Sequence, residues 1–324
     1  MDGFLNVLKP KGITSHDAVL QVRRVFNRKR AGHLGTLDPM AQGVLPVALG
    51  CYTRLSEYLL DEEKEYLAEF TFGISTDTCD FDGRITSERP CAHLTASDVS
   101  KLLSNYTGEI KQIPPAYSAV QVKGQRLHNL ARRGIRIEAP ERDVTVHEFC
   151  LLHWKPGTYP RGIFRLRVGR GTYVRSIARD LGDELGCGAA VSYLLRTRVG
   201  TFLLKDSVLM SSLKGKAPAF PLQDALVNPY TVFAEFPLFE IRPDSITSVI
   251  HGRPLEPGAF RDPGEIKAWV RRTSESTCKK KSVFIGAYTD DITKRQRIAC
   301  VLSAAQDGDE LYRIKYEKVL IQEE

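Results

Sequence analysis

Residues 32–50 read GHLGTLDPMAQGVLPVALG, and this stretch carries most of the information about the fold. Four glycines and two prolines divide it, and its single acidic side chain, Asp38, lies between Leu37 and Pro39. A Gly- and Pro-rich segment that leads into an apolar run, here 44–49, is typical of a loop held against a buried strand or helix. Rigidly anchored loops often carry catalytic groups. Asp-Pro is also a common turn, so these residues alone leave Asp38 as either a turn residue or a catalytic one.

On the N-terminal side of this stretch, we expect a short strand at 4–8 and a helix capped at Thr14-Ser15, with Asp17 in its first turn. Basic side chains gather towards the end of that helix. Cations are favoured at a helix C-terminus, but five of them directly before the loop are more than the helix end requires. The pattern predicts a patch that contacts phosphates, made of Arg23, Arg24, Arg28, Lys29 and Arg30.

On the C-terminal side, we expect a helix near 53–61 and then a strand in KEYLAEFTFGI, where Tyr66 falls on the strongly apolar face. By pattern alone, Tyr66 reads as a core aromatic. The acidic segment TDTCDFDG follows at 76–83. It does not fit a calcium loop, because Thr78 would hold the first ligand position and Arg89 the last. We therefore expect a turn without a metal.

Further along, a capped helix is expected from Leu94 to Tyr106, and paired strands at 143–154 and 163–168. A second basic patch comprises Arg126, His128, Arg132, Arg133 and Arg136.

The segment GRGTYVRSIARDLG begins as a glycine turn and continues as a helix. It lacks the third glycine and the Lys-Ser/Thr pair of a phosphate loop, so nucleotide binding is not expected. Arg175 falls in the first turn of the helix, where a cation opposes the helix dipole. Two interpretations remain: Arg175 pairs with a buried carboxylate, or it is exposed.

Residues 213–235 resemble a linker, and several short apolar-alternating segments follow it. They are IRPDSITSVIHGRPLEPG, IKAWV, SVFIGAY, RIACVL and LYRIKYEKVLI. Short strands at this spacing predict a small β-barrel or sandwich. The run KKK at 279–281 is interpreted as a solvated loop.

The composition, with 42% hydrophobic and 26% charged residues among 324, is that of a globular protein. The net charge of +7 suggests an anionic partner, with nucleic acid the first candidate. Seven cysteines without CxxC spacing argue for reduced thiols rather than a disulfide frame or a zinc site. No apolar run resembles a signal peptide or spans a bilayer. We expect a soluble cytoplasmic protein.

A series of motifs then appears in a recognisable order: NVLKPKGITSHDAV from 6, GHLGTLDPMAQGVLPVALG from 32, KEY from 64, TDTCDFDG from 76, QIPPAYSA from 112 and GTYVRSIARDLG from 171. Together they resemble the bacterial tRNA pseudouridine-55 synthases of the TruB family, over about residues 4–235. Each short motif is weak evidence, but the ordered set is very specific.

The resemblance implies an α+β pseudouridine synthase fold with a central, largely antiparallel sheet at 1–235, followed by a small C-terminal PUA-like β-barrel that binds RNA at 236–324. It implies isomerisation of uridine 55 in the T loop of tRNA, by breaking the N1–C1′ bond, rotating the flipped base and rejoining it through C5. It implies no cofactor, no metal, no membrane and no obligatory protein partner; we expect a monomer. A tRNA-folding chaperone activity can accompany the reaction.

The resemblance also assigns residues. Asp38 matches the essential aspartate, and Arg175 matches the arginine that pairs with it. Tyr66 matches the tyrosine that stacks on the target ring and can assist removal of the C5 proton. His33 matches the histidine that supports the extruded base in the T loop. Tyr173 and Leu194 match further substrate-pocket positions.

The carboxylate could attack C1′, add to C6 or take a proton from C2′, and the sequence does not choose among these routes. Gln121 stands where the family commonly has lysine, and His128 where tyrosine is usual, which affects local RNA contacts only. After SVIHGRPLEPG at 248–258, which resembles a PUA opening, the C-terminal region diverges. The rival hypotheses are a non-catalytic RNA-binding protein or chaperone, and a related synthase of guide-RNA particles.

Overall fold

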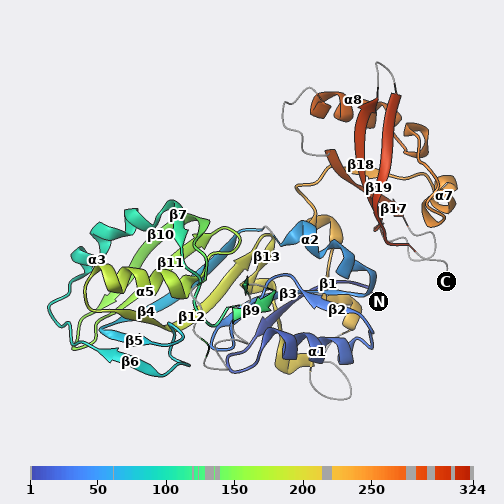
Figure 1. Ribbon diagram of the computed structural model, residues 1–324. Helices are drawn as coiled ribbons and strands as arrows, with labels where there is room; N and C mark the ends of the chain where they lie inside the picture. Colours follow the sequence, from blue (N-terminus) through green and yellow to red (C-terminus); the bar gives the residue numbers. More distant parts are fainter. Residues whose placement is uncertain are drawn as a thin grey trace.

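The structure is a computed structural model. It describes residues 2–60, 62–118, 120–122, 124–127, 135, 139–213, 221–274, 282–289, 296–307 and 311–321. One large sheet with helices at its side takes up the N-terminal part, and a smaller sheet lies at the C-terminal end (Figure 1). The described part of the chain has no helix long and apolar enough to cross a membrane.

The large sheet has 11 strands, with the main order β14-β1-β3-β12-β4-β11-β10-β7. Among the described pairings in it, only β1–β14 and β12–β3 are parallel, so the predicted largely antiparallel sheet is confirmed. Its strands are β1 (Gly3–Lys9), β2 (Ala31–His33), β3 (Gln42–Leu49), β4 (Lys64–Phe72), β7 (Gly108–Gln112), β10 (Arg142–Lys155), β11 (Arg161–Val168), β12 (Ala189–Val199), β13 (Phe202–Leu203), β14 (Val208–Leu209) and β15 (Leu226–Val227).

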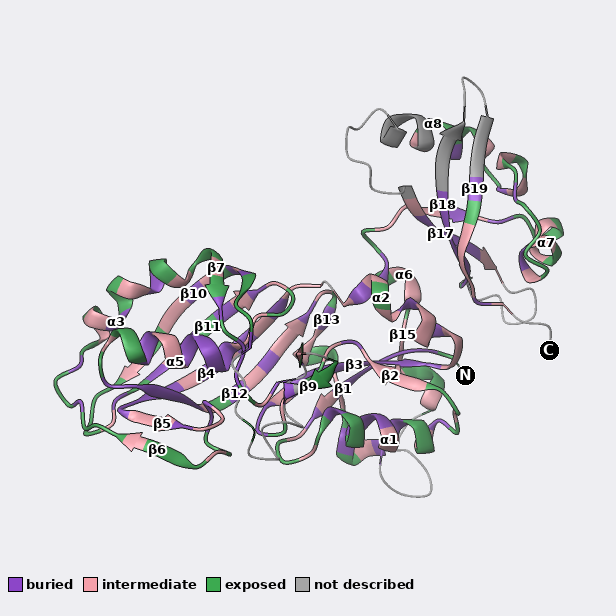
Figure 2. Cartoon of the chain, viewed as in Figure 1, coloured by how far each residue is buried: buried purple, intermediate pink, exposed green. Residues whose placement is uncertain are grey.

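Three helices of this part form where the sequence predicts them. They are α1 (Ser15–Val25), α3 (Ala96–Leu102) and α5 (Val174–Glu184). Thr14 and Thr95 cap the first two through capping boxes with Asp17 and Asp98, which satisfies backbone N–H groups that a helix start leaves unpaired. The apolar side of α5 packs against β12 and β4. Figure 2 colours most of α5, and many positions of the two strands, as buried. The packing fixes the start of α5, where Arg175 lies.

Shorter elements connect these: η1 (Gly50–Leu55), α2 (Ser56–Leu59), β5 (Ile74–Thr76), β6 (Ile85–Glu88), η2 (Leu103–Tyr106), β8 (Gln121–Val122), β9 (Gln125–Arg126), η3 (Leu204–Asp206), η4 (Met210–Leu213), η5 (Leu222–Ala225) and α6 (Pro229–Val232). The helix expected near 53–61 is therefore one 3₁₀ segment and a single α-turn. The linker interpretation of 213–235 is wrong in part, because β15 pairs with β1 and belongs to the sheet.

The C-terminal sheet has the order β16-β17-β18-β19. Its elements are β16 (Leu238–Glu240), η6 (Pro243–Ser245), α7 (Ile246–Ile250), η7 (Pro257–Ala259), α8 (Pro263–Ser274), β17 (Ser282–Thr289), β18 (Gln296–Asp307) and β19 (Leu311–Val319). The small, strand-rich C-terminal domain is present as predicted. The boundary at residue 236 stays a prediction.

Two of the predicted C-terminal strands are helices instead: SITSV lies mainly in α7, and IKAWV lies in α8. A short apolar run fits both the helical repeat and the alternation of a strand, so its spacing alone does not distinguish the two. The signal overlooked was Asp262-Pro263, an N-cap followed by proline at the first helical position. Asp262 Oδ1 accepts a hydrogen bond from Glu265 N at 3.0 Å.

The two sheets share a buried apolar cluster in which Phe4, Tyr52 and Phe233 meet Ile285 and Val301. Polar contacts border it: Arg54 donates to the carbonyl of Val319 at 2.8 Å, and Lys318 pairs with Glu57 at 2.8 Å. Several predicted features lie outside the described residues, namely His128, Arg132, Arg133 and Arg136 of the second basic patch and the run KKK at 279–281.

Candidate active site

A cleft of about 830 Å³ opens beside the loop that links β2 to β3. Loop 34–41 forms one wall, the start of β4 and the middle of β12 form its floor, and the start of α5 forms the other wall. All six site residues predicted from the sequence line it: His33, Asp38, Tyr66, Tyr173, Arg175 and Leu194. Segments up to about 160 positions apart in the chain therefore meet in one place.

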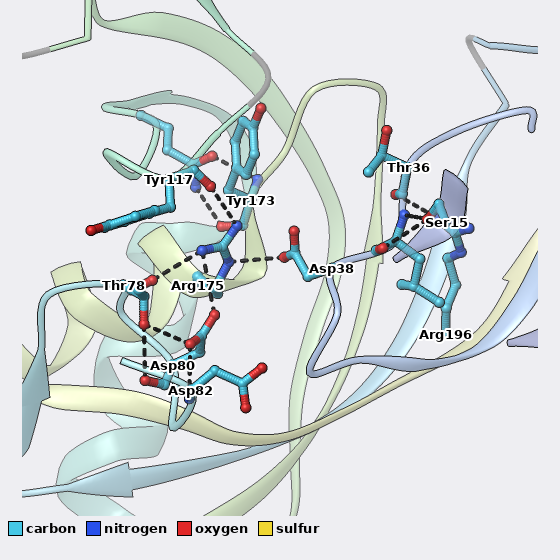
Figure 3. Close-up of polar contacts among 12 residues, drawn as sticks. Ser15, Thr36, Asp38, Thr78, Asp80, Asp82, Tyr117, Tyr173, Arg175 and Arg196 are labelled. Atoms are coloured by element: carbon cyan, nitrogen blue, oxygen red, sulfur yellow. Dashed lines mark hydrogen bonds and ion pairs between the residues drawn. The ribbon is translucent and has the colours of Figure 1, made fainter. Parts of the chain in front are cut away.

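Asp38 faces Arg175 across the cleft, with 2.9 Å between Asp38 Oδ2 and Arg175 Nε (Figure 3). The arginine side chain is 4% exposed and the aspartate 30%. The exposed-arginine interpretation is thus wrong, and the expected carboxylate partner is present. A buried guanidinium beside a half-open carboxylate stabilises its negative charge and leaves its second oxygen free to reach a ligand.

Arg175 is itself held on its far edge by the turn between β5 and β6. Its Nη1 lies 3.4 Å from Asp80 Oδ2 and donates to the carbonyl of Thr78 at 3.0 Å, and its Nη2 donates to the carbonyl of Tyr117 at 3.1 Å. Burial raises the pKa of Asp80. The side-chain hydrogen bond from Thr78 and the positive charge of Arg175 act in the opposite direction and lower it. The acidic turn 76–83 therefore orients the arginine.

The floor of the cleft is apolar and aromatic. Tyr66 on β4 is 9% exposed and Leu194 on β12 is 4% exposed. Tyr173 is the N-cap residue of α5, and burial raises the pKa of its phenol. Gln112 from β7 holds Tyr173 in place, since its Oε1 accepts from Tyr173 N at 2.8 Å and its Nε2 donates to Tyr173 O at 3.1 Å.

His33 ends β2 at the rim of the cleft. Burial lowers the pKa of its imidazole, and the positive charge of Arg196 adds to that shift. The residue therefore favours the neutral ring that can pack against a base. Within the described residues no cluster of His, Cys, Asp and Glu could hold a metal ion.

Comparison of the sequence with known proteins shows which family it matches. Residues 23–174 match the model for the TruB family pseudouridylate synthase N-terminal domain, and residues 175–223 match the tRNA pseudouridylate synthase B C-terminal domain. The tRNA pseudouridine synthase B of Pelotomaculum thermopropionicum is 42% identical over 267 residues, which cover 81% of this chain and 84% of the relative. The chain belongs to the TruB family. It is a pseudouridine synthase, an isomerase.

Other TruB relatives agree. The tRNA pseudouridine synthase B of Moorella thermoacetica is 49% identical over 214 residues, covering 66% of this chain and 70% of the relative. Among solved structures, Cbf5 in a Cbf5-Nop10-Gar1 complex superposes with a TM-score of 0.69 at 23% identity, covering 99% of this chain and 85% of that one. At that identity the likeness concerns the fold, and it confirms the predicted pseudouridine synthase fold.

Sequence reasoning missed several residues of this TruB site. Asp80 was interpreted only as part of a turn and Ser15 only as part of a helix cap, and Lys9, Gln112 and Arg196 were assigned no role. Lys9 is fully buried and donates to the carbonyls of Ile13 at 2.7 Å and Pro39 at 3.4 Å. Each of these residues also makes a contact with a segment far away in the chain, and local spacing does not reveal such contacts.

Proposed function

We propose that this enzyme converts uridine 55 in the T loop of tRNA to pseudouridine. Its relatives carry the name tRNA pseudouridine synthase B, and the motif set from which the site was predicted is that of the uridine-55 enzymes. The observation that carries the proposal is the Asp38–Arg175 pair, 2.9 Å apart at the wall of an aromatic-floored cleft.

The reaction needs no external reactant. The N1–C1′ bond breaks, the uracil rotates, a C5–C1′ bond forms, and the proton at C5 is lost while N1 ends protonated. An ionised Asp38 serves each of the three routes: attack on C1′, addition to C6, or removal of the C2′ proton. Arg175 stabilises the carboxylate charge until the substrate arrives.

The remaining residues receive roles from their positions. Tyr66 stacks on the target ring from the floor, and its hydroxyl is the candidate group for the C5 proton. Leu194 and Tyr173 enclose the ring, which excludes water. His33 at the rim supports the T loop after the base leaves its stack. Base flipping is needed because the Asp38 side chain is only 30% exposed in the wall of the cleft, where a uridine still stacked in the RNA cannot reach it.

The test is Asp38→Asn, assayed on an unmodified tRNA transcript with no other component. We expect pseudouridine formation to vanish while the dissociation constant for tRNA changes by less than about tenfold, since one carboxylate supplies little of a binding surface dominated by phosphate contacts. Mapping the product by carbodiimide-dependent reverse-transcription stops identifies the modified position. Near-normal turnover in the variant, or a product elsewhere than position 55, overturns the proposal.

We further propose that the protein works on tRNA as a monomer and without a guide RNA, and that it assists tRNA folding. The exposed cations Arg23, Arg24, Lys29 and Arg30 at the end of α1 support tRNA binding that does not depend on catalysis. Folding of a misfolded transcript is the readout. If the catalytically dead Asp38→Asn protein fails to speed it, the chaperone activity is absent.

A further inference from the structure

We propose that Arg196 is a positioning residue for the reaction: its guanidinium holds the backbone of loop 35–38 so that the Asp38 carboxylate projects into the cleft. This inference rests on the proposed function of Asp38. Arg196 does not itself need to touch the substrate, because all its observed hydrogen bonds go to backbone carbonyls.

Each of the three nitrogens of Arg196 donates a separate hydrogen bond, and Figure 3 shows the acceptor Thr36 beside the guanidinium. Nε donates to Val44 O at 2.7 Å, Nη1 to Thr36 O at 3.1 Å and Nη2 to Gly35 O at 3.1 Å. The residue is 1% exposed, and among the described residues no carboxylate forms an ion pair with it. A buried arginine that donates only to backbone carbonyls is unusual, since buried charges are normally paired with an opposite charge.

The backbone of β12 places Arg196 under the loop. Arg196 is the parallel partner of Gly43 on β3 and the antiparallel partner of Tyr66 on β4. A Cβ atom at Gly43 would lie 2.2 Å from the Arg196 carbonyl oxygen, so glycine is what allows β3 to approach this closely. The same register that sets Tyr66 in the floor of the cleft therefore sets the guanidinium beneath Gly35 and Thr36.

The loop is held from a second direction by α1 and β1. Ser15 Oγ donates to Leu37 O and accepts from Leu37 N, both at 2.8 Å, and Lys9 donates to Pro39 O at 3.4 Å. The backbone on both sides of Asp38 is thus fixed, while its side chain is left to face Arg175. A flexible Gly- and Pro-rich loop becomes a rigid support through buried polar groups, each of which would be costly to leave unpaired.

The charge of Arg196 also reaches the cleft. It contributes to lowering the pKa of both His33 and Lys9, after the larger effect of burial. Catalysis by a carboxylate depends on the distance and direction of its approach, and a displacement of 1 Å can cost about 100-fold in rate. A lysine at 196 would keep the charge but lose the planar fork that reaches three carbonyls at once.

The test compares Arg196→Lys and Arg196→Met with Arg198→Met, a matched control two residues along β12 whose guanidinium instead pairs with Glu63 at 3.2 Å. Single-turnover rate at saturating enzyme, the dissociation constant for tRNA and the thermal unfolding midpoint are measured for each, below the unfolding transition. We expect Arg196→Met to lower the rate by about 100-fold, with tRNA affinity within about threefold of wild type. Arg196→Lys should be intermediate, and Arg198→Met should keep the rate.

A rate within about threefold of wild type for folded Arg196→Met overturns the inference, as does a loss that only follows the unfolded fraction. If Arg196→Met does not fold, Arg196→Lys decides, because it retains the charge; a wild-type rate there overturns the inference as well. The two proposals fail separately. Turnover by Asp38→Asn would remove the proposed function, whereas an inactive Asp38→Asn beside a fully active Arg196→Met would remove only the role of Arg196.

Discussion

The buried Asp80 carboxylate lies 3.4 Å from Nη1 of Arg175, the same guanidinium whose Nε faces Asp38 at 2.9 Å. One arginine thus lies between two carboxylates of different exposure, 6% for Asp80 and 30% for Asp38. Asp80 and the carbonyls of Thr78 and Tyr117 hold the cation, and the cation in turn faces the more open carboxylate. The site therefore depends on a structural pair as well as on the proposed catalytic one.

Arg175→Met should abolish turnover and also destabilise the fold. It leaves Asp80 buried without its cation, and losing one partner of a buried pair costs about 3–5 kcal/mol. Adding Asp80→Asn should restore most of that stability but none of the activity. Urea denaturation and the tRNA assay, run on the single and double variants, separate the two effects. Unchanged turnover in Arg175→Met would show that the Asp38–Arg175 pair is dispensable.

Gln112→Ala should lower the free energy of unfolding by about 1–3 kcal/mol, because it leaves the buried N–H of Tyr173 without an acceptor. The loss should also loosen the start of α5 and so reduce turnover more than tRNA affinity. Gln121→Ala, at an exposed position of β8, is the control and should stay within about 0.5 kcal/mol of wild type. Equal stability of the two variants would contradict this role for Gln112.

Lys9 predicts a pH dependence of stability. Burial lowers the pKa of its ammonium group from the ordinary 10.5 to about 8, against the opposing charge of Asp38. Between these values the unfolded chain binds more protons than the folded one, so the free energy of unfolding rises with pH across this window. Lys9→Met should lack that rise. Urea denaturation of both proteins across the window gives the difference, and parallel pH profiles would refute the prediction.

Gly43→Ala should destabilise the protein by about 3 kcal/mol or more, because φ is +116° and the new Cβ would collide with Arg196 O. The control is Gly32→Ala, where no heavy atom lies within 4 Å of the added Cβ, with an expected change of about 0.5 kcal/mol or less. Thermal unfolding followed by circular dichroism measures both. A tolerated Gly43→Ala would mean that β3 and β12 can separate without loss.

The local sequence pattern was enough to predict many of the helices and strands. The alternation in KEYLAEFTF predicted β4, the cap signals at Thr14-Ser15 and in the segment from Leu94 predicted the starts of α1 and α3, and the glycine turn before Tyr173 predicted the start of α5. Such signals depend on neighbours in the chain, so a sequence can display them. These local signals failed for the short apolar runs of α7 and α8, where the spacing fits both the helical repeat and the alternation of a strand.

By itself, the sequence determined the TruB family, the mixed fold and the candidates Asp38, Tyr66 and Arg175, because these are written in ordered motifs and local periods. Only the tertiary structure decided what surrounds them. Asp80, which pairs with Arg175, and Arg196, which donates to carbonyls of the Asp38 loop, come from distant segments, and these contacts leave no mark on residue spacing. Burial and strand register, which create those contacts, exist only once the chain has folded.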